Sequence, residues 1–240
     1  MSDSTSSPVR SAAFTALVAL VCSLLLTGAA TGLKDRKLRN VAVDRQKNIL
    51  KSVGLIDPGQ SVTVDQIEQR YRENIRCESV DGTGAIVGDG NDPDALPVCF
   101  YVKDGQPAAY ILPVASRGLW GKIHGYMAIE NDGRTVAGFS VYSHNETPGL
   151  GGEIEKPWFQ KNFVGKKIVD QSGAFTPVAI AKGKVAEAVP EARQANYVDG
   201  ISGATLTGKY LTGGLEAVLM QYEDLSQRFR EGQVNLPAGG

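Results

Sequence analysis

Residues that bind metal ions are scarce in this sequence. The 240 residues include two histidines and three cysteines, with no CxxC pair and no cluster of cysteine with histidine. Structural zinc sites and iron–sulfur clusters are built from such groups of ligands. We therefore expect no protein-ligated metal site in this chain.

A surplus of one charge is also lacking. The 25 lysines and arginines balance 26 aspartates and glutamates, for a net charge of −1. This balance gives no reason to expect nucleic acid as a partner. Familiar catalytic motifs are absent too: there is no Walker loop and no GxSxG, and Ile154 stands where GxGxxG would need its last glycine. Because neither histidine has an acid or nucleophile at a diagnostic spacing, we assign no catalytic residue and interpret His144 as a surface or structural residue.

One long stretch, residues 12–33, carries no charge at all and reads AAFTALVALVCSLLLTGAATGL. As a helix rising 1.5 Å per residue, it is long enough to cross roughly 30 Å of hydrocarbon. We predict an uncleaved transmembrane helix at 12–33, after a cytoplasmic N-terminus at 1–11. A cleaved signal peptide with residues 12–26 as its apolar core is the alternative. The basic residues at 34–39 follow the helix, and by the positive-inside rule they would keep the following domain in the cytoplasm.

Helical periodicity is clear in three later segments. The apolar spacing of residues 40–55 predicts an amphipathic helix that ends at Gly54. A second helix is predicted from Thr63, because Thr63 and Gln66 form a capping-box pattern. A final helix is predicted from about Thr205. Its apolar face consists of Leu211, Leu215, Val218, Leu219 and Tyr222.

Two glycines, Gly213 and Gly214, lie inside the final helix. Each weakens a helix by ~1 kcal/mol relative to alanine. We therefore expect close packing or close approach at this pair. The tail that follows is residues 229–240, and its last ten residues, 231–240, are predicted to fray.

Strand patterns fill the middle of the chain. Residues 97–102 and 107–114 predict two strands, and residues 121–144 predict a hairpin that turns at Asp132-Gly133. Residues 81–94 predict a loop from their Gly, Asp and Pro content, and residues 177–181 a short strand.

Hairpins with helices at both ends predict an α+β domain with a mainly antiparallel sheet and flanking helices. A short helix is also expected within residues 158–165. We divide the chain after the membrane helix into a helical linker and first part of the soluble domain at 34–95, a main domain at 96–228 and the tail.

Residues 202–207 read SGATLT and have two interpretations. In the first, Ser202 or Thr205 caps the final helix by accepting hydrogen bonds from backbone N–H groups. In the second, the N–H groups and partial positive charge of the helix start stabilise a phosphate on Thr205 or Thr207, with Lys209 as a nearby cation. These residues permit a phosphate without identifying one.

A second informative stretch, ETPGLGGE at residues 146–153, contains three glycines and a proline. Such a loop lets the backbone approach a ligand closely, although a plain surface turn has the same composition.

The stretch DGISGATLTG resembles the flavinylation motif of the FMN-binding domain family, [ST]GA[ST]x[ST], with its last position at Thr207. The stretches RGLWGKIHGYMAIENDGRTVAGFSVYSHNETPGLGGEIEKPWF and DRQKNILKSVGL, with the apolar N-terminal segment, resemble the family of C subunits of Na+-translocating NADH:quinone oxidoreductases over almost the whole chain. The G subunit of the related ferredoxin-linked electron-transport complex shares the flavin motif and ETPGLG. GLWGKIHGYMA and GLGGE favour the C-subunit family. The alternatives are a flavoprotein like that G subunit and a non-redox anchored binding module.

The resemblance implies that FMN is joined covalently to Thr207 through a phosphoester bond. The other residues expected to bind the cofactor belong to the motif, to the glycine-rich loop or to the GLWG block: Ser202, Gly203, Ala204, Thr205, Leu206, Lys209, Trp120, Glu146, Thr147, Gly149 and Leu150. The loop 146–152 and Trp120 are expected to pack against the isoalloxazine ring.

The resemblance also implies a role in a six-subunit complex that oxidises NADH, reduces ubiquinone and exports Na+. The chain, inactive alone, would pass electrons from a membrane-embedded iron–sulfur centre to the flavin of the B subunit, with the B, D and E subunits as main partners. It would be single-pass in the bacterial inner membrane, with a periplasmic soluble domain that receives FMN from FAD through a flavin transferase. In that compartment Cys77 and Cys99 would form a disulfide or remain two buried thiols.

Overall fold

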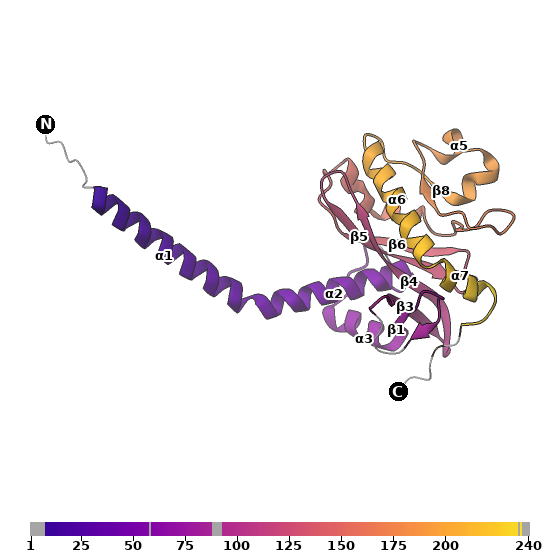
Figure 1. Ribbon diagram of the computed structural model, residues 1–240, viewed down its shortest axis with the longest axis horizontal. Coiled ribbons are helices and arrows are strands. Elements are labelled where there is room, and N and C mark those ends of the chain that lie inside the picture. Colours follow the sequence, from indigo (N-terminus) through magenta and orange to yellow (C-terminus); the bar gives the residue numbers. More distant parts are fainter. Residues whose placement is uncertain (1–7, 58, 88–92, 235, 237–240) are drawn as a thin grey trace. The chain divides into compact units, whose positions relative to one another are not determined.

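The computed structural model describes residues 8–57, 59–87, 93–234 and 236 (Figure 1). The expected N-terminus at 1–11, loop at 81–94 and tail at 229–240 lie in part outside these residues. Within the described part of the expected loop, residues 86–87 form a short strand instead, because they pair with residues 79–80. The chain forms two compact units, Met1–Val43 and Asp44–Gly240.

The first unit contains α1 (Pro8–Gly32), a helix of 25 residues. Among the described residues, it is the one helix long and apolar enough to cross a membrane, and none of its residues is buried. It begins at Pro8, earlier than the sequence pattern indicated. The next helix, α2 (Lys34–Ser52), begins in the first unit and ends in the second.

The second unit is built on a six-stranded sheet with every neighbouring pair antiparallel. The order across the sheet is β2 (Ile86–Val87), β1 (Ile75–Val80), β3 (Leu96–Lys103), β4 (Gln106–Arg117), β5 (Lys122–Glu130) and β6 (Val136–Ser143). The α+β fold with a mainly antiparallel sheet is therefore confirmed.

The predicted turn between β5 and β6 forms as expected. Gly133 has a φ of +63°, which glycine adopts without strain. The Asp132 carboxylate accepts hydrogen bonds from the backbone N–H groups of Arg134 and Thr135, both at 2.8 Å. This side-chain bonding stabilises the chain reversal and so sets the register of the hairpin.

The two faces of the sheet are covered by different helices, as alternation along β6 shows. Phe139 and Val141 belong to the main core, together with the apolar face of α6 (Thr205–Gln221). All the residues predicted to form that apolar face are buried. On the other face, the Ser140 hydroxyl donates to the Asn48 carbonyl in α2 at 2.9 Å. A Cβ at Gly138 would lie 2.5 Å from the Ser52 carbonyl oxygen, so α2 ends directly against the sheet.

Further helices complete these layers. The main core also includes Leu225 and Phe229 of α7 (Glu223–Arg230) and Phe159 of α4 (Pro157–Lys161). Helix α3 (Val64–Asn74) begins with the predicted capping box between Thr63 and Gln66.

The shorter elements lie between β6 and α6. They are the 3-10 helices η1 (Gly151–Glu155) and η2 (Glu191–Asn196), the helix α5 (Val185–Ala188), and the strands β7 (Ala179–Ile180) and β8 (Tyr197–Val198), which pair in parallel. The predicted strand at 177–181 thus forms with two residues. The SGATLT motif begins in the segment between β8 and α6 and ends in the first turn of α6.

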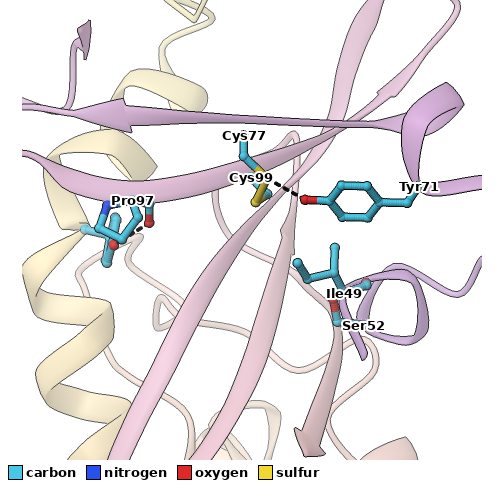
Figure 2. Close-up of a disulfide and its surroundings, with 7 residues drawn as sticks. Ile49, Ser52, Tyr71, Cys77, Pro97 and Cys99 are labelled. Carbon is cyan, nitrogen blue, oxygen red and sulfur yellow. Dashed lines mark hydrogen bonds between the residues drawn. A yellow bond between two sulfur atoms is a disulfide. The ribbon is translucent and has the colours of Figure 1, made fainter. Parts of the chain in front are cut away.

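A disulfide joins β1 to β3 (Figure 2). Cys77 and Cys99 are direct partners in the antiparallel register of these strands. Figure 2 shows Tyr71 of α3 pointing toward the disulfide, with its hydroxyl 3.1 Å from the sulfur of Cys77. Burial raises the pKa of Tyr71. The disulfide is therefore formed, and the alternative of two buried thiols is wrong.

Candidate functional site

The SGATLT motif contains a buried hydroxyl held by a carboxylate. Thr207 lies in the first turn of α6 and is 2% exposed, and Glu146 is 4% exposed. The Thr207 hydroxyl donates to Glu146 Oε2 at 2.5 Å, across 61 positions of sequence. The fold thus joins the two stretches that the sequence singled out separately.

Glu146 is fixed by contacts from two further segments. Its Oε1 accepts the backbone N–H of Trp120 at 3.0 Å, and its own backbone N–H donates to His144 Nδ1 at 3.1 Å. Because Nδ1 accepts, the imidazole proton of neutral His144 is on Nε2, 3.3 Å from a Glu155 carboxylate oxygen. The hydrogen bond from Lys156, with a smaller contribution from His144, holds the pKa of Glu155 below its usual value. The interpretation of His144 as a structural residue agrees with these contacts.

Two glycines give the Glu146 carboxylate its space. A Cβ at Gly151 would lie 2.6 Å from the Thr207 hydroxyl oxygen and 2.7 Å from Glu146 Oε2. A Cβ at Gly118 would lie 2.4 Å from Glu146 Oε1. All three distances are too short for real atoms, so the Thr207–Glu146 contact requires glycine at both positions.

A cavity of about 210 Å³ adjoins this contact. Its lining includes eight of the residues expected to bind the cofactor: Trp120, Glu146, Thr147, Leu150, Gly203, Ala204, Thr205 and Leu206, together with Thr207 itself. The sequence prediction missed two lining residues, Leu119 and Gly151, although both lie in stretches that it quoted. The remaining expected residues, Ser202, Lys209 and Gly149, do not line this cavity.

Lys209 lies on a second cavity, of about 330 Å³, which shares Ala204 and Thr205 with the first. This cavity is also lined by Lys182 and by residues of β7 and β8. The start of α6 therefore has a cavity on each of two sides, and Thr205 borders both.

Apolar side chains surround the mouth of the first cavity. Trp120 is 68% exposed, and Leu119, Leu150 and Leu206 are each more than 40% exposed. Large apolar groups that remain open to solvent beside a cavity are typical of a ligand or partner site. A flat aromatic ligand has the shape and polarity to cover them.

Helix α6 begins without a side-chain cap. Its N-cap residue is Ala204, and no side chain hydrogen bonds to the helix start. The first of the two interpretations, in which Ser202 or Thr205 caps the helix, is therefore wrong. The reason is positional, since Thr205 is already the first helical residue. The N–H groups of the first turn have no partner within the helix, and this arrangement favours anions.

The position of α6 on the sheet depends on one of its two glycines. A Cβ at Gly214 would lie 2.3 Å from the side chain of Ser116 at the end of β4. The Ser116 hydroxyl also donates to the Tyr210 carbonyl oxygen at 2.8 Å. The expected close approach is confirmed at Gly214 and wrong at Gly213, where no atom lies within 4 Å of an added Cβ.

Acidic, histidine and cysteine side chains do not gather elsewhere into a metal site. In the part of the chain that the structure describes, no group of three or more of these residues is placed to hold a metal ion. The Thr207 site itself consists of a hydroxyl and a carboxylate beside an open cavity.

The class of protein follows from this site and from a family comparison. The FMN-binding domain model matches residues 118–220, which run from the Gly118 turn through most of α6. The match to this family model thus identifies an FMN-binding domain in this part of the chain.

Whole-chain relatives give the particular family. The C subunit of the Na(+)-translocating NADH-quinone reductase from Pseudomonas aeruginosa is 35% identical over 225 residues, covering 80% of this chain and 84% of the relative. The same subunit from Vibrio campbellii is 32% identical over 250 residues, covering 91% and 94%. The crystal structure of the Parabacteroides distasonis C subunit is 33% identical, with a TM-score of 0.69 over 81% of this chain and 96% of that one. The chain belongs to this C-subunit family, and its apolar helix α1 fits a membrane-anchored protein.

Proposed function

We propose that this chain carries FMN joined to Thr207 through a phosphoester bond, with the isoalloxazine ring against Trp120 and Leu150. The observation that carries the proposal is the buried Thr207 hydroxyl at an uncapped helix start beside an open cavity. The first-turn N–H groups of α6 suit a phosphate. The apolar rim suits a flat ring.

The bound FMN would serve as a one-electron carrier within a Na+-translocating NADH:quinone oxidoreductase. In this role the chain receives electrons from an iron–sulfur centre and delivers them to the flavin of the B subunit, while the complex oxidises NADH, reduces ubiquinone and exports Na+. The B, D and E subunits are its main partners, and it is inactive alone. A covalent bond suits this task because the carrier stays in place through every redox state.

The soluble domain would face the periplasm, anchored in the inner membrane by α1. The Cys77–Cys99 disulfide supports this side, because disulfides persist in oxidising compartments. The basic residues at 34–39 argue against it by charge count, although long domains translocate largely regardless of flanking charge. Fusions at the C-terminus test the side: alkaline phosphatase should be active there, and a reporter that works only in the cytoplasm should be silent.

The attachment is tested in the full chain, produced together with a flavin transferase. Thr207→Ala should abolish flavin fluorescence in a denaturing gel, whereas Thr205→Ala should slow attachment without preventing it. The matched pair separates loss of the bond from disturbance of the helix start. Fluorescence that survives denaturation in the Thr207→Ala variant would contradict the assignment. A non-redox binding module would show no covalent flavin in any variant.

A further inference from the structure

We propose that Glu146 is the catalytic base for flavin attachment, accepting the proton that Thr207 loses when its Oγ1 forms the phosphoester. This inference rests on the proposed function, since it concerns the same hydroxyl. It assigns to the acceptor chain a chemical role that would otherwise fall to the flavin transferase alone.

The geometry of the hydroxyl points to this role. Thr207 Oγ1 donates its proton to Glu146 Oε2 at 2.5 Å, and the other carboxylate oxygen is occupied by the Trp120 N–H. The contact therefore lies within the reach that proton transfer requires, and the acceptor atom is the carboxylate oxygen without a second donor. The arrangement is that of a nucleophile and its base.

The surroundings leave Glu146 available as a base. Within the described part of the chain, no ion pair joins Glu146 to a basic side chain. The Glu146 carboxylate contacts the Thr207 hydroxyl of α6 and the Trp120 N–H of the β4–β5 turn. His144 accepts the backbone N–H of Glu146 through Nδ1, and its Nε2 lies beside the Glu155 carboxylate. Gly118 and Gly151 keep the carboxylate in contact with the hydroxyl by having no side chain.

The atoms of the reaction balance with FAD as co-reactant. Thr207 Oγ1 attacks the phosphorus on the FMN side of the FAD pyrophosphate, and the bond from that phosphorus to the bridging oxygen breaks. AMP leaves with the electron pair of that bond, and the Thr207 proton passes to Glu146. No oxidation or reduction takes place.

A purely structural role for this hydrogen bond does not suit the mature protein. Once Oγ1 is esterified it has no proton to donate, so the bond to Glu146 is lost when the flavin is attached. A base, in contrast, is needed only before attachment. Burying a carboxylate costs free energy unless the carboxylate is hydrogen-bonded. In this proposal Glu146 is buried beside Thr207 because the attachment step needs a base there.

The experiment follows initial rates of flavin attachment to the purified full chain in detergent, with FAD and a fixed amount of flavin transferase. Glu146→Gln keeps the size of the side chain and an oxygen for the Trp120 N–H, but removes the proton acceptor. We expect the rate at neutral pH to fall by about 100-fold or more. Glu153→Gln, which removes a carboxylate from the same loop without contact to Thr207, should keep the wild-type rate.

The pH profile separates a base from a positioning group. Dividing the wild-type rate by the Glu146→Gln rate at each pH removes the pH dependence of the transferase itself, because that dependence affects both rates equally. This ratio should be large at neutral pH and fall in acid, because a carboxyl group that already carries a proton cannot accept another. If Glu146→Gln fails to fold, the Glu146→Asp variant is measured in its place. It should react more slowly and still lose rate in acid.

The two proposals fail in different ways. A Glu146→Gln rate within about threefold of wild type, with a ratio that does not change with pH, would overturn the role of Glu146 while leaving Thr207 as the attachment site; such a change is far below a base contribution. If Glu146→Gln fails to fold, a Glu146→Asp rate equal to wild type would overturn it, because the shorter side chain moves the carboxylate away from Thr207 Oγ1. Flavin on the Thr207→Ala chain would instead overturn the proposed function.

Discussion

Two helices in this chain begin at hydroxyl residues and use them differently. At the start of α3, the Thr63 side chain accepts the Gln66 N–H at 3.3 Å, and the Gln66 side chain accepts the Thr63 N–H at 3.0 Å. At the start of α6, no side chain caps the helix, and the Thr207 hydroxyl is directed instead to the buried Glu146 carboxylate. Similar residues therefore serve helix formation at one site and a buried polar contact at the other.

The difference shows which interactions stabilise each helix. Exposed α3 has one buried residue, Ile67, so a cap contributes a large part of its stability. Helix α6 buries Leu211, Leu215, Val218 and Leu219, and packing stabilises it without a cap. Its first turn is therefore free for another use, and we propose phosphate binding.

The strongest way to break the α6 start is Gly151→Ala. The new methyl group would lie 2.6 Å from the Thr207 hydroxyl oxygen and 2.7 Å from Glu146 Oε2, too close to both, so one or both must move. We expect a loss of about 1–3 kcal/mol in the free energy of unfolding, together with a large drop in flavin attachment. Chemical denaturation and gel fluorescence measure the two effects. The neighbouring Gly152→Ala, whose nearest contact would be the Thr147 carbonyl oxygen at 3.1 Å, should do much less. Equal effects from the two variants would contradict this explanation.

The packing of α6 against β4 is tested at two neighbouring positions of the helix, Gly213 and Gly214. Gly214→Ala would collide with Ser116 and should destabilise the domain by about 1–3 kcal/mol. Gly213→Ala meets open space and should stabilise the helix by up to about 1 kcal/mol. Thermal unfolding of the two variants should therefore shift in opposite directions. Shifts of the same sign would show that close packing does not position α6.

The comparison itself is tested by removing one hydroxyl from each helix start. Thr63→Ala removes the capping box and should cost about 1 kcal/mol of stability. Flavin attachment should remain as in wild type. Thr205→Ala removes no cap bond, so its stability should stay within about 0.5 kcal/mol of wild type, while attachment slows. Reversed results would mean that Thr205 is a cap after all.

The smallest effect is expected from Asp199, which precedes the motif. Its carboxylate accepts the Val185 N–H at 2.8 Å and pairs with Lys184 at 3.0 Å. These contacts hold the pKa of Asp199 below its usual value, so they stabilise the fold above the unfolded pKa of about 3.9. This stability is lost as pH falls through the lower folded value.

Asp199→Asn should therefore cost about 0.5 kcal/mol at pH 7, and little at the acid end. Unfolding curves of both proteins across this pH range measure the difference. If the difference in unfolding free energy between the two proteins grew toward acid pH, it would contradict this role of Asp199.

The sequence predicted the elements whose signals are local. The capping box at Thr63, the Asp132-Gly133 turn and the apolar face of α6 each depend on residues close together in the chain. Strand β1 was missed, because its sequence IRCESV mixes polar and apolar residues without clear alternation, although the strand lies between β2 and β3 in the sheet. Helix α7 was not separated from α6.

The candidate site was predictable only in part. The motif and the glycine-rich loop were recognisable by their resemblance to a family. The bond between Thr207 and Glu146 was not, since it joins residues 61 positions apart and depends on how β6 and α6 meet. Gly118 likewise has a role only in three dimensions, where its missing side chain admits the carboxylate.

The central claim is that Thr207 carries the flavin, and peptide mapping of the wild-type chain tests it most directly. The full chain is produced with a flavin transferase, digested, and the peptide that contains residues 202–209 is fragmented in a mass spectrometer. We expect one FMN on Thr207 and none on Ser202 or Thr205. An unmodified Thr207 in a chain that carries covalent flavin elsewhere would contradict the claim.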